Sequence, residues 1–472
     1  MRRAMSQKIV FQTFLVLFVA QFVSCKSSQT KEVEYFPDGT EISSWFSDTA
    51  RINPDTLGVQ FVVTGYGAVG DGETMNTEAI QRTIDEAASQ GGGVVVIPEG
   101  RFLTGALFFK PHTHLHVKEG GVLLGSDDIS NFPMMPSRME GRSIDYFPAV
   151  VNAYGVDGFT ITGKGTIDGN GLKYWKAFWQ RRSENPQCTN LEVSRPRLIF
   201  IQNSDNIQLQ DVQLRNSGFW TTHLYRCNQA KIIGLHIFSP AKPIPAPSTD
   251  GIDIDNCFNV LVNGCYIETS DDAIALKGGK GPWADTDPTN GPNNNIIIQN
   301  CTFGFCHSVL TCGSETINNR NIILRNSKVD GPKRVLWLKH RADTPQLNEY
   351  IRIENIKGKT EALLFLKSWS QFFDLQGRET KPPSQSEHVA FHNIELVCDR
   401  IIQKDISEDE KFEDFTFENL KINSKDSNLD KSLFDGVTLK NVEVNGKMIG
   451  SKNTGIDDQI SWGAVPRSVA VR

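Results

Sequence analysis

Three carboxylates in two short segments are the residues of this chain best suited to chemistry. Asp250 lies in residues 248–253, and Asp271 and Asp272 follow in residues 269–272. Two carboxyl groups separated by the width of a water molecule are what acid–base hydrolysis of a sugar acetal requires. Because Asp-Gly and Asp-Asp dipeptides are common in turns, their meaning depends on the elements that position them.

A repeat of short apolar patterns surrounds the three aspartates. Apolar residues occupy positions 0, +2, +5 and +7 of each copy, and the copies begin about 22 to 38 residues apart, a spacing typical of solenoids. The copies begin at Ile207, Val260, Ile296, Ile322, Ile351, Val389, Phe415 and Val437, with a looser copy at Ile232. Position +4 is Asn in most later copies: Asn300, Asn326, Asn355, Asn393, Asn419 and Asn441.

This repeat predicts an all-β fold, a parallel β-helix. Two short strands of period 2, joined by a polar bend, make one side of a coil. Stacking then pairs each strand with its copy at a spacing of about 4.8 Å, and the Asn side chains are expected to form a hydrogen-bonded ladder. A leucine-rich repeat would show an L-x-x-L-x-L signature, and a propeller would need four strands per repeat.

Two further features fit a β-helix. Residues 77–90 predict a helix with Asn76 or Thr77 as its N-cap and an apolar face of Ile80, Ile84, Ala87 and Ala88. This helix is expected to cap the exposed first coil. Cys265 and Cys301 fall at the inward +5 position, which Ile237 is also expected to occupy, so we interpret them as buried free thiols. Export would still leave a disulfide open.

The first 25 residues resemble an export signal. Arg2, Arg3 and Lys8 precede an apolar run that is too short and interrupted for a confident membrane span. The run ends at Cys25 in a pattern that resembles a bacterial lipoprotein cleavage site, which predicts lipidation of Cys25; ordinary signal cleavage nearby is the alternative. The expected location is the periplasm, the outer membrane or the cell surface.

The rest of the chain divides into three predicted parts. Residues 26–57 are interpreted as a tether and the segment that leads into the first coil, with Trp45 and Phe46 as anchors. Residues 58–448 are expected to form the β-helix catalytic domain, and residues 449–472 a C-terminal tail. We expect a monomer.

The charge of the chain bears on its partners. The formal net charge is −6, and removal of the three basic residues before Cys25 makes it −9. This balance argues against a nucleic-acid partner, and an anionic substrate would need locally clustered cations. The sequence contains no zinc-binding Cys/His pattern, and no metal or cofactor is expected.

Further polar residues recur one coil apart after the aspartates. His307 follows Asp271 and Asp272 by one coil, and Lys339 follows His307 by another. On successive coils these residues would line one strip, which suits a linear polymer whose carboxylates pair with cations. One coil of offset with lateral splay predicts the separation of about 6.5–9.5 Å typical of inverting glycosidases. Crowding should also raise the pKa of one carboxyl group.

At this point the chain resembles glycoside hydrolase family 28, the polygalacturonase group. The family's motifs are Asn-Thr-Asp, Asp-Asp, Gly-His-Gly and Arg-x-Lys, and this sequence has similar segments around Asp250, Asp271 and Asp272, His307 and Lys339. Residues 66–72 and residues 216–223, which end at His223, also resemble family segments. The resemblance covers about residues 60–445. It implies a right-handed β-helix and metal-free, inverting hydrolysis of galacturonic-acid linkages in pectic polysaccharide.

The resemblance also implies roles for individual residues. Asp271 matches the general acid, and Asp250 and Asp272 match the pair that holds and deprotonates the attacking water. His307 matches the histidine that tunes the acid, and Lys339 matches the lysine that contacts a substrate carboxylate. His223 is a further candidate for substrate contact.

This sequence departs from the family pattern at four residues, and the departure at Trp337 affects the expected substrate. Ser248 replaces Asn, Cys306 and Ser308 replace the glycines beside His307, and Trp337 stands where the family has Arg. An indole stacks on a sugar face instead of pairing with a carboxylate. Arg334 or Arg341 would then supply the charge, and a rhamnogalacturonan or branched pectin with a neutral sugar beside the scissile bond is favoured.

Other functions stay open from the sequence. A polysaccharide lyase on a similar β-helix would need a carboxylate cluster for calcium with an arginine base. A non-catalytic carbohydrate-binding β-helix is the third possibility. The long loop at residues 278–294 is a candidate for blocking one end of the groove, which favours exo action over endo action; its alternative interpretation is a surface loop.

Overall fold

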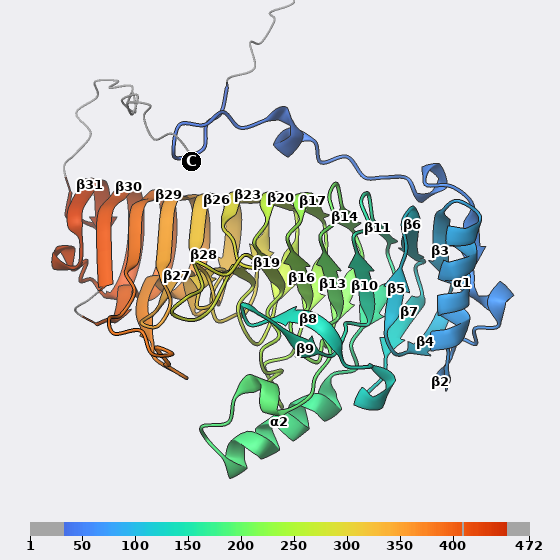
Figure 1. Ribbon diagram of the computed structural model, residues 1–472. Coiled ribbons are helices and arrows are strands. Elements are labelled where there is room, and N and C mark those ends of the chain that lie inside the picture. The colour runs from blue at the N-terminus through green and yellow to red at the C-terminus, as the bar shows by residue number, and fades with distance from the viewer. Residues whose placement is uncertain (1–32, 408–409, 451–472) are drawn as a thin grey trace, which may run out of the picture. The chain divides into compact units, whose positions relative to one another are not determined.

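A computed structural model describes residues 33–407 and 410–450 of the protein. Nearly all strands belong to one large sheet whose neighbours are parallel, and this sheet winds through successive coils within the compact unit that begins at Tyr35 (Figure 1). The predicted parallel β-helix is therefore confirmed. Among the described residues, no helix is long and apolar enough to cross a membrane.

One face of the coils, here called the site sheet, carries the chemistry. Its strands pair in sequence order, each with the strand one coil before and one coil after. They are β5 (Leu107–Phe109), β10 (Val151–Tyr154), β13 (Ile199–Gln202), β16 (Thr222–Tyr225), β19 (Ile252–Asp255), β22 (Ile274–Lys277), β25 (Leu310–Gly313) and β27 (Arg334–Arg341).

Two further faces complete each coil. The second face holds β1 (Gln60–Val62), β3 (Gly93–Ile97), β6 (Thr113–Val117), β11 (Thr160–Gly163), β14 (Gln208–Gln210), β17 (Asn228–Ile233), β20 (Phe258–Asn263) and β23 (Asn293–Gln299). The third face holds β2 (Asp71–Met75), β4 (Gly100–Thr104), β7 (Gly121–Gly125), β12 (Thr166–Asp168), β15 (Gln213–Arg215), β18 (His236–Phe238), β21 (Tyr266–Glu268) and β24 (Thr302–Phe303).

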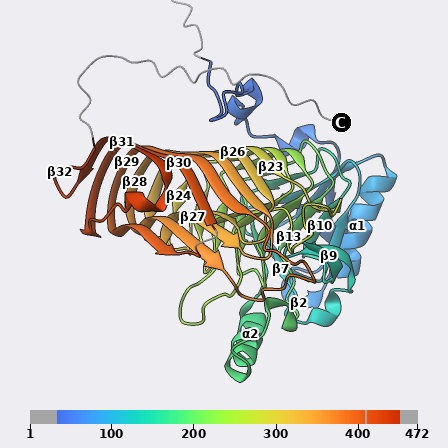
Figure 2. The ribbon, with the colours of Figure 1, turned by 60° about the vertical axis from the view of Figure 1, so that its left-hand side comes forward.

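In the later coils the strands run through the bends without interruption. Figure 2 shows these long strands stacked at the C-terminal end. They are β26 (Asn318–Asp330), β28 (Gln346–Trp369), β29 (Ser384–Asp405), β30 (Glu410–Asp426) and β31 (Asp435–Val444), and the short β32 (Lys447–Met448) pairs antiparallel with β31. The remaining regular elements are the antiparallel hairpin β8 (Met135–Met139) and β9 (Arg142–Tyr146), and the helices α1 (Thr77–Ser89) and α2 (Leu172–Glu184).

Aligned apolar ladders fill the interior of the coils. Leu209, Ile232, Val262 and Ile298 are paired rung by rung, and none is exposed. The predicted copy starting at Ile232 is therefore two residues out of register, because Ala230 pairs with Val260 and takes position 0. Ile237 consequently occupies position +7 and not +5, opposite Leu214 and Ile267.

The predicted asparagine ladder is confirmed. Each amide of Asn355, Asn393, Asn419 and Asn441 donates to the Asn one coil before it, at 2.8–3.2 Å. All four have φ near +55°, a left-handed conformation that Asn tolerates better than most residues. Two more ladders were not predicted: one joins Asn228, Asn259, Asn295 and Asn321, and a buried one joins Asn293, Asn319, Asn348 and Ser386.

The first coil is capped as predicted. The N-cap of α1 is Asn76, and Ile80, Ile84 and Ala87 are fully buried against the first strands, although Ala88 is only half-buried. Cys265 and Cys301 are buried free thiols, also as predicted. Their place inside the coils leaves them in an apolar ladder.

Residues 35–57 lie along the outside of the coils. Phe36 and Phe46 pack on Leu261, Ile297 and Ile323, so the predicted anchor at Phe46 is confirmed. Between residue 33, where the described part begins, and β1 at Gln60, no strand forms. The predicted signal with Cys25, and the tail from residue 451 onward, lie outside the described residues.

The buried ladder leads to a stability prediction. Asn319 donates to Asn348 at 2.7 Å and accepts from Asn293 at 2.9 Å, and its side chain is fully buried. Asn319→Ala leaves two buried partners unsatisfied, so we expect a loss of about 2 kcal/mol or more in the free energy of unfolding, measured by urea denaturation. The exposed Lys421→Ala in β30 serves as control; equal stability of the two variants would contradict the ladder's contribution.

Candidate active site

The register of the site sheet brings the predicted residues together. Ile252 pairs with Ile274, and Ile274 pairs with Leu310, so the segments preceding β19, β22 and β25 also stack. The amide of Gly251 donates to the carbonyl of Asp272, and the amide of His307 donates to the carbonyl of Asp271. The aspartates and His307 therefore lie on three successive coils, and Lys339 in β27 lies on the next.

The three carboxylates are closer together than the sequence predicted. One carboxylate oxygen each of Asp250, Asp271 and Asp272 lies within 4.8 Å of the other two. The expected separation of about 6.5–9.5 Å is too long for these nearest oxygens, because Asp250 and Asp272 lie in segments that stack directly on one another. A bend at residues 270–273 lets both Asp271 and Asp272 reach the site, and the amide of Asp272 donates to Oδ1 of Asp271.

Asp271 and His307 form an ion pair at the edge of the site. Nδ1 of His307 lies 3.3 Å from Oδ1 of Asp271, and the two side chains are 33% and 26% exposed. Burial alone would raise the pKa of Asp271, but the positive charge of His307 and its hydrogen bond lower that pKa below its usual range. Burial opposes the charge on His307 in turn, yet Asp271 raises the pKa of His307. The pair thus shares one proton, held on His307 in the empty site.

Asp250 is a carboxyl group whose ionisation falls near neutral pH. Burial, followed by the negative charge of Asp271, raises the pKa of Asp250 to about 7. Burial and the charge of Asp250 also raise the pKa of Asp253, whose two oxygens have no hydrogen-bond partner among the described residues. The predicted rise of one pKa in a crowded carboxylate group is confirmed.

Lys277 provides a positive charge beside these carboxylates, and it was not predicted from the sequence. Its Nζ lies 3.5 Å from Asp250, 3.7 Å from Asp253 and 3.3 Å from Glu315. Burial disfavours the cation, but the charges of Glu315 and the aspartates raise the pKa of Lys277 well above its usual value. A signal was present, because Ile274 and Leu276 point inward in β22 and place Lys277 on the outer face next to β19.

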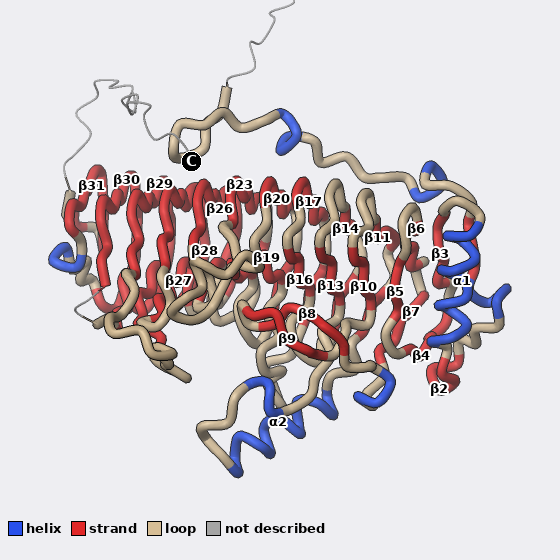
Figure 3. Tube along the Cα trace, viewed as in Figure 1, coloured by secondary structure: helices blue, strands red, loops and turns tan. Residues whose placement is uncertain are grey.

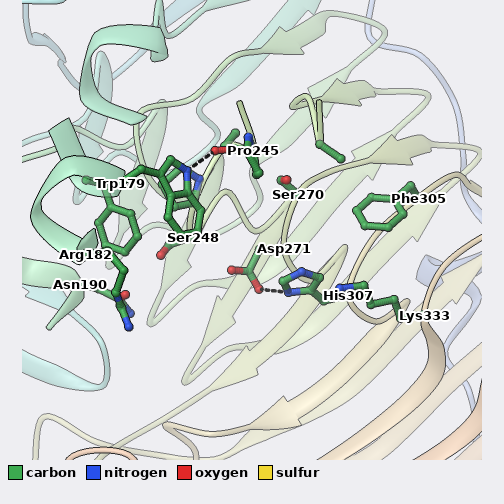
Figure 4. Close-up of a pocket in the computed structure, with 14 residues that line it drawn as sticks. Trp179, Arg182, Asn190, Pro245, Ser248, Ser270, Asp271, Phe305, His307 and Lys333 are labelled. Carbon is green, nitrogen blue, oxygen red and sulfur yellow. Dashed lines mark hydrogen bonds and ion pairs between the residues drawn. The ribbon is translucent and has the colours of Figure 1, made fainter. Parts of the chain in front are cut away.

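Two cavities of different character meet at Asp271. The first, here the charged cavity, has a volume of about 70 Å³ and is lined by Asp250, Asp272, Lys277, Lys280, Lys339 and Arg341 among others. The second, here the aromatic cavity, has about 510 Å³ and is lined by Phe178, Trp179, Pro245, Phe305 and His307 among others (Figure 4). Asp271 lines both.

Three segments wall the charged cavity. Glu140, in the turn of the β8–β9 hairpin, pairs with Lys280 at 3.2 Å. Lys280 belongs to the loop at residues 278–292, which makes up most of the segment 278–294 predicted to block the groove. Arg378 of the 370–383 loop donates to the carbonyl of Pro282 in the 278–292 loop. Phe372 adds a side chain to the lining. Figure 3 shows the hairpin lying over the strands of the site sheet.

Helix α2 builds one side of the aromatic cavity and was not predicted. Tyr174 donates to the carbonyl of Ser126, Trp175 to that of Ser217 and Trp179 to that of Pro245, at 2.7–2.9 Å. Its signal was the apolar spacing of Trp175, Phe178 and Trp179, which is the i, i+3, i+4 pattern of an amphipathic helix.

The two residues beside His307 have side chains where the family has glycines, and these side chains lie inside the protein. Cys306 and Ser308 are both fully buried, and the hydroxyl of Ser308 donates to the carbonyl of Leu310. Both side chains point away from the site, which leaves His307 facing Asp271.

Trp337 does not contact either cavity, which corrects its predicted stacking on a sugar. Its ring is 5% exposed, and the cations of Arg334 and Lys339 lie 4.7 and 4.4 Å from the ring centre. Lys339 also lies 4.2 Å from the ring centre of Trp369. Trp337 therefore supports Lys339 through cation–π contact, and Lys339 lines the charged cavity.

Arg334 and Arg341 take different positions from Lys339. Arg334 donates to the carbonyl of His307 at 3.3 Å and lines neither cavity. Arg341 lines the charged cavity, but its guanidinium forms a two-point ion pair with Asp343 at 2.8 Å. The charge of Arg341 is thus already matched within the protein.

His223 lies beneath the site, which corrects its predicted contact with substrate. It is fully buried, with Nε2 3.3 Å from Asp255 and Nδ1 2.7 Å from Arg197. Burial lowers the pKa of His223 to about 4, although Asp255 opposes this. Asp255 also holds Arg138 of β8 at 2.9 Å, so the cluster anchors the hairpin that walls the charged cavity.

The three aspartates also have the geometry of a cation site. Among the described residues, they form the group whose oxygens are spaced to hold a divalent ion. Lys277 and Lys339 already lower the pKa of these carboxyl groups. A metal ion would have to compete with two built-in cations for the same oxygens.

Removal of Lys277 should shift the ionisation of Asp250. Because Lys277 lowers the pKa of Asp250, Lys277→Met should raise it from about 7 by about one to three pH units. Carbon-13 NMR titration of labelled aspartate carboxyl groups, assigned with Asp250→Asn, measures the change. Lys280→Met is the matched control, because Lys280 pairs with Glu140 instead. An unchanged pKa in Lys277→Met would refute this electrostatic link.

Comparison with known proteins gives a consistent result. Residues 134–359 match the family model described as glycosyl hydrolases family 28, and residues 60–115 match one described as rhamnogalacturonase A/epimerase, pectate lyase-like. A probable polygalacturonase of Vitis vinifera is 33% identical over 261 residues, covering 53% of this chain and 50% of that protein. An exo-poly-alpha-D-galacturonosidase of Dickeya chrysanthemi is 27% identical, covering 62% of this chain and 54% of that protein.

The chain spans about half the length of the curated relatives it matches. A solved exopolygalacturonase of Thermotoga maritima superposes with a TM-score of 0.69 at 24% identity, covering 82% of this chain and 92% of that one. This likeness confirms the right-handed parallel β-helix. Residues 134–359, which contain Asp250, Asp271, Asp272, His307 and Lys339, match glycosyl hydrolases family 28, so the resemblance to this family is confirmed for that part of the chain.

Proposed function

We propose that this protein is an exported glycoside hydrolase that removes single galacturonic-acid residues from the non-reducing ends of pectic chains, with inversion. The observation that carries the proposal is the position of the aspartates between a small charged cavity and a larger aromatic one. The activities named for the Vitis vinifera and Dickeya chrysanthemi relatives support the substrate class, and the signal-like residues 1–25 support export.

The two cavities determine which sugar lies on each side of the scissile bond. Asp250 and Asp272, which would hold the water, line the charged cavity but not the aromatic one. The water attacks the anomeric carbon, so the sugar that contains this carbon belongs in the charged cavity. His307 lines only the aromatic cavity, so the leaving sugar belongs there.

The charged cavity suits one terminal galacturonate. It is the smaller of the two cavities, and the hairpin and the 278–292 loop wall it, which limits the length of chain that it can hold. Lys339 provides a cation for the sugar carboxylate. Because the enclosed sugar is the one attacked at its anomeric carbon, it is the non-reducing end of the chain. These features favour exo action.

The proton positions suit a single displacement. Asp250, with a pKa of about 7, is a suitable base for the water proton. As the water oxygen bonds to the anomeric carbon, the bond to the leaving oxygen breaks. Asp271 gives this oxygen a proton, which His307 supplies across their 3.3 Å contact. Two carboxylates facing the same sugar suit a held water better than a single nucleophile, despite their close spacing.

Loss of the acid should remove most activity. Asp271→Asn retains the shape of the side chain but cannot pass on the proton, so we expect kcat on oligogalacturonates to fall about 10²–10⁴-fold. Release of reducing ends measures the effect, with circular dichroism as a check on folding. Asp435→Asn, at an exposed site in β31, is the control. Full activity of Asp271→Asn would overturn the assignment.

Product analysis tests the mode of cleavage. We expect polygalacturonate to yield free galacturonate as the only early product by chromatography. Oligomers whose non-reducing sugar is a bulky substituted uronide should resist, because the walled cavity excludes them. NMR during the first turnovers should show the anomer opposite to the substrate linkage.

Each alternative mechanism would leave a different product. Early release of longer oligomers would mean endo action, and the retained anomer would mean double displacement. Products with ultraviolet-absorbing unsaturated ends, lost on addition of a chelator, would mean elimination by a lyase. Binding of pectic chains without turnover would instead indicate a carbohydrate-binding β-helix.

A further inference from the structure

The aromatic cavity has charged residues that the proposed reaction does not use. Besides its aromatic walls, it is lined by Arg182 of α2 and by Lys333, which precedes β27. In Figure 4, Arg182 lies on the α2 side and Lys333 on the His307 side, with Asp271 between them. A cavity that held only a neutral sugar would have no need for either cation.

These two cations lack carboxylate partners among the described residues. Arg182 donates to the carbonyl of Pro186 at 3.4 Å and lies over the ring of Phe178, and its Nε is buried without a hydrogen bond. Lys333 has its Nζ 5.6 Å from the ring centre of Phe305. In the charged cavity, by contrast, Lys280 and Arg341 are each paired with a carboxylate of the protein.

The positions of both cations are fixed. Phe178 and Arg182 are four residues apart on α2 and share one face. The helix itself is tied to the coils through Tyr174, Trp175 and Trp179. Lys333 is tied by its own amide, which donates to the carbonyl of Cys306 at 2.8 Å. The cavity therefore presents charges that are already in place before a ligand arrives.

Lys333 lies closer to the acid pair than Arg182 does. It sits one coil beyond His307, and its charge opposes the raised pKa of His307. Arg182 lies on α2, on the other side of Asp271 in Figure 4. The sugar whose oxygen receives the proton is thus nearer to Lys333, and the following sugar is nearer to Arg182.

We propose that the aromatic cavity recognises two acidic sugars of the leaving chain, with Lys333 binding the carboxylate of the first and Arg182 that of the second. Trp179 and Phe305 contact their apolar faces. This inference rests on the proposed function and specifies its substrate as a run of consecutive galacturonates. It replaces the sequence-based expectation of a neutral sugar beside the scissile bond, which depended on Trp337.

Oligomers of defined length and charge test the proposal. Digalacturonate fills only the first leaving-sugar position, whereas trigalacturonate fills both. Lys333→Gln should lower kcat/KM for both substrates at least about tenfold, since a charge-assisted contact is lost. Arg182→Gln should lower kcat/KM about tenfold for trigalacturonate and leave the value for digalacturonate nearly unchanged. Lys421→Gln, exposed in β30, is the matched control.

A measurement on the unaltered protein gives an independent test. Methyl esterification of the reducing-end sugar of digalacturonate removes the carboxylate that Lys333 would bind, so kcat/KM should fall at least about tenfold. Equal rates for the acid and the ester would overturn the proposal, as would equal effects of Arg182→Gln on the two chain lengths.

Galacturonosyl fluoride separates this inference from the proposed function. Its leaving group is too small to reach either cation, so Lys333→Gln should affect the fluoride far less than it affects digalacturonate. Hydrolysis of the fluoride with equal rates for digalacturonate and its ester would overturn only the inference. Failure to hydrolyse the fluoride and every galacturonide would overturn the proposed function, and the inference with it.

Discussion

Parallel pairing between coils at a fixed spacing of about 4.8 Å is the constraint on which the rest of the structure depends. Because Ile252 pairs with Ile274, Asp250 and Asp272, each two residues earlier, must lie beside one another. Strands elsewhere use the same spacing to stack Ile on Ile or Asn on Asn, which is favourable. At the site it stacks carboxylate on carboxylate, which is unfavourable unless other groups compensate.

The compensation comes from cations held at the same spacing. Lys277 lies in the strand next to Asp253, and Lys339 lies two coils further, supported by the rings of Trp337 and Trp369. A buried charge without a partner would cost several kcal/mol. The compensation is incomplete, and the pKa of Asp250 consequently stays raised, at about 7. The reactivity proposed for the site and the electrostatic cost of its packing therefore have the same origin.

The repeat made the coils predictable from the sequence, because inward ladders and Asn bends depend on local pattern alone. The same logic placed Asp250, Asp271, Asp272 and His307 on successive coils. The error at Ile232 arose because Ala230 is too small to mark position 0 by its apolar character. The separation of the carboxylates was wrong because it depends on how the bend at residues 270–273 orients the side chains, which the repeat does not specify.

Features that depend on long-range contacts could not be predicted. Histidine is a residue type common in binding sites, so His223 was a reasonable candidate from the sequence. Its partners Arg197 and Asp255 are known only once the coils are stacked. Trp337 occupies an outward position, yet Arg334, Lys339 and Phe365 cover it. Helix α2 and the β8–β9 hairpin interrupt the repeat, and only their tertiary contacts reveal that they form the walls of the two cavities.

The walls of the charged cavity determine how a long polymer would be handled. In the proposed reaction, a sugar released in this cavity leaves past Asp271, along the path by which the chain entered. The shortened chain must therefore withdraw before its new terminus can be seated, and it competes at that moment with every other chain end in solution. Attack is then distributive, and turnover depends on the concentration of chain ends and not on the length of the polymer.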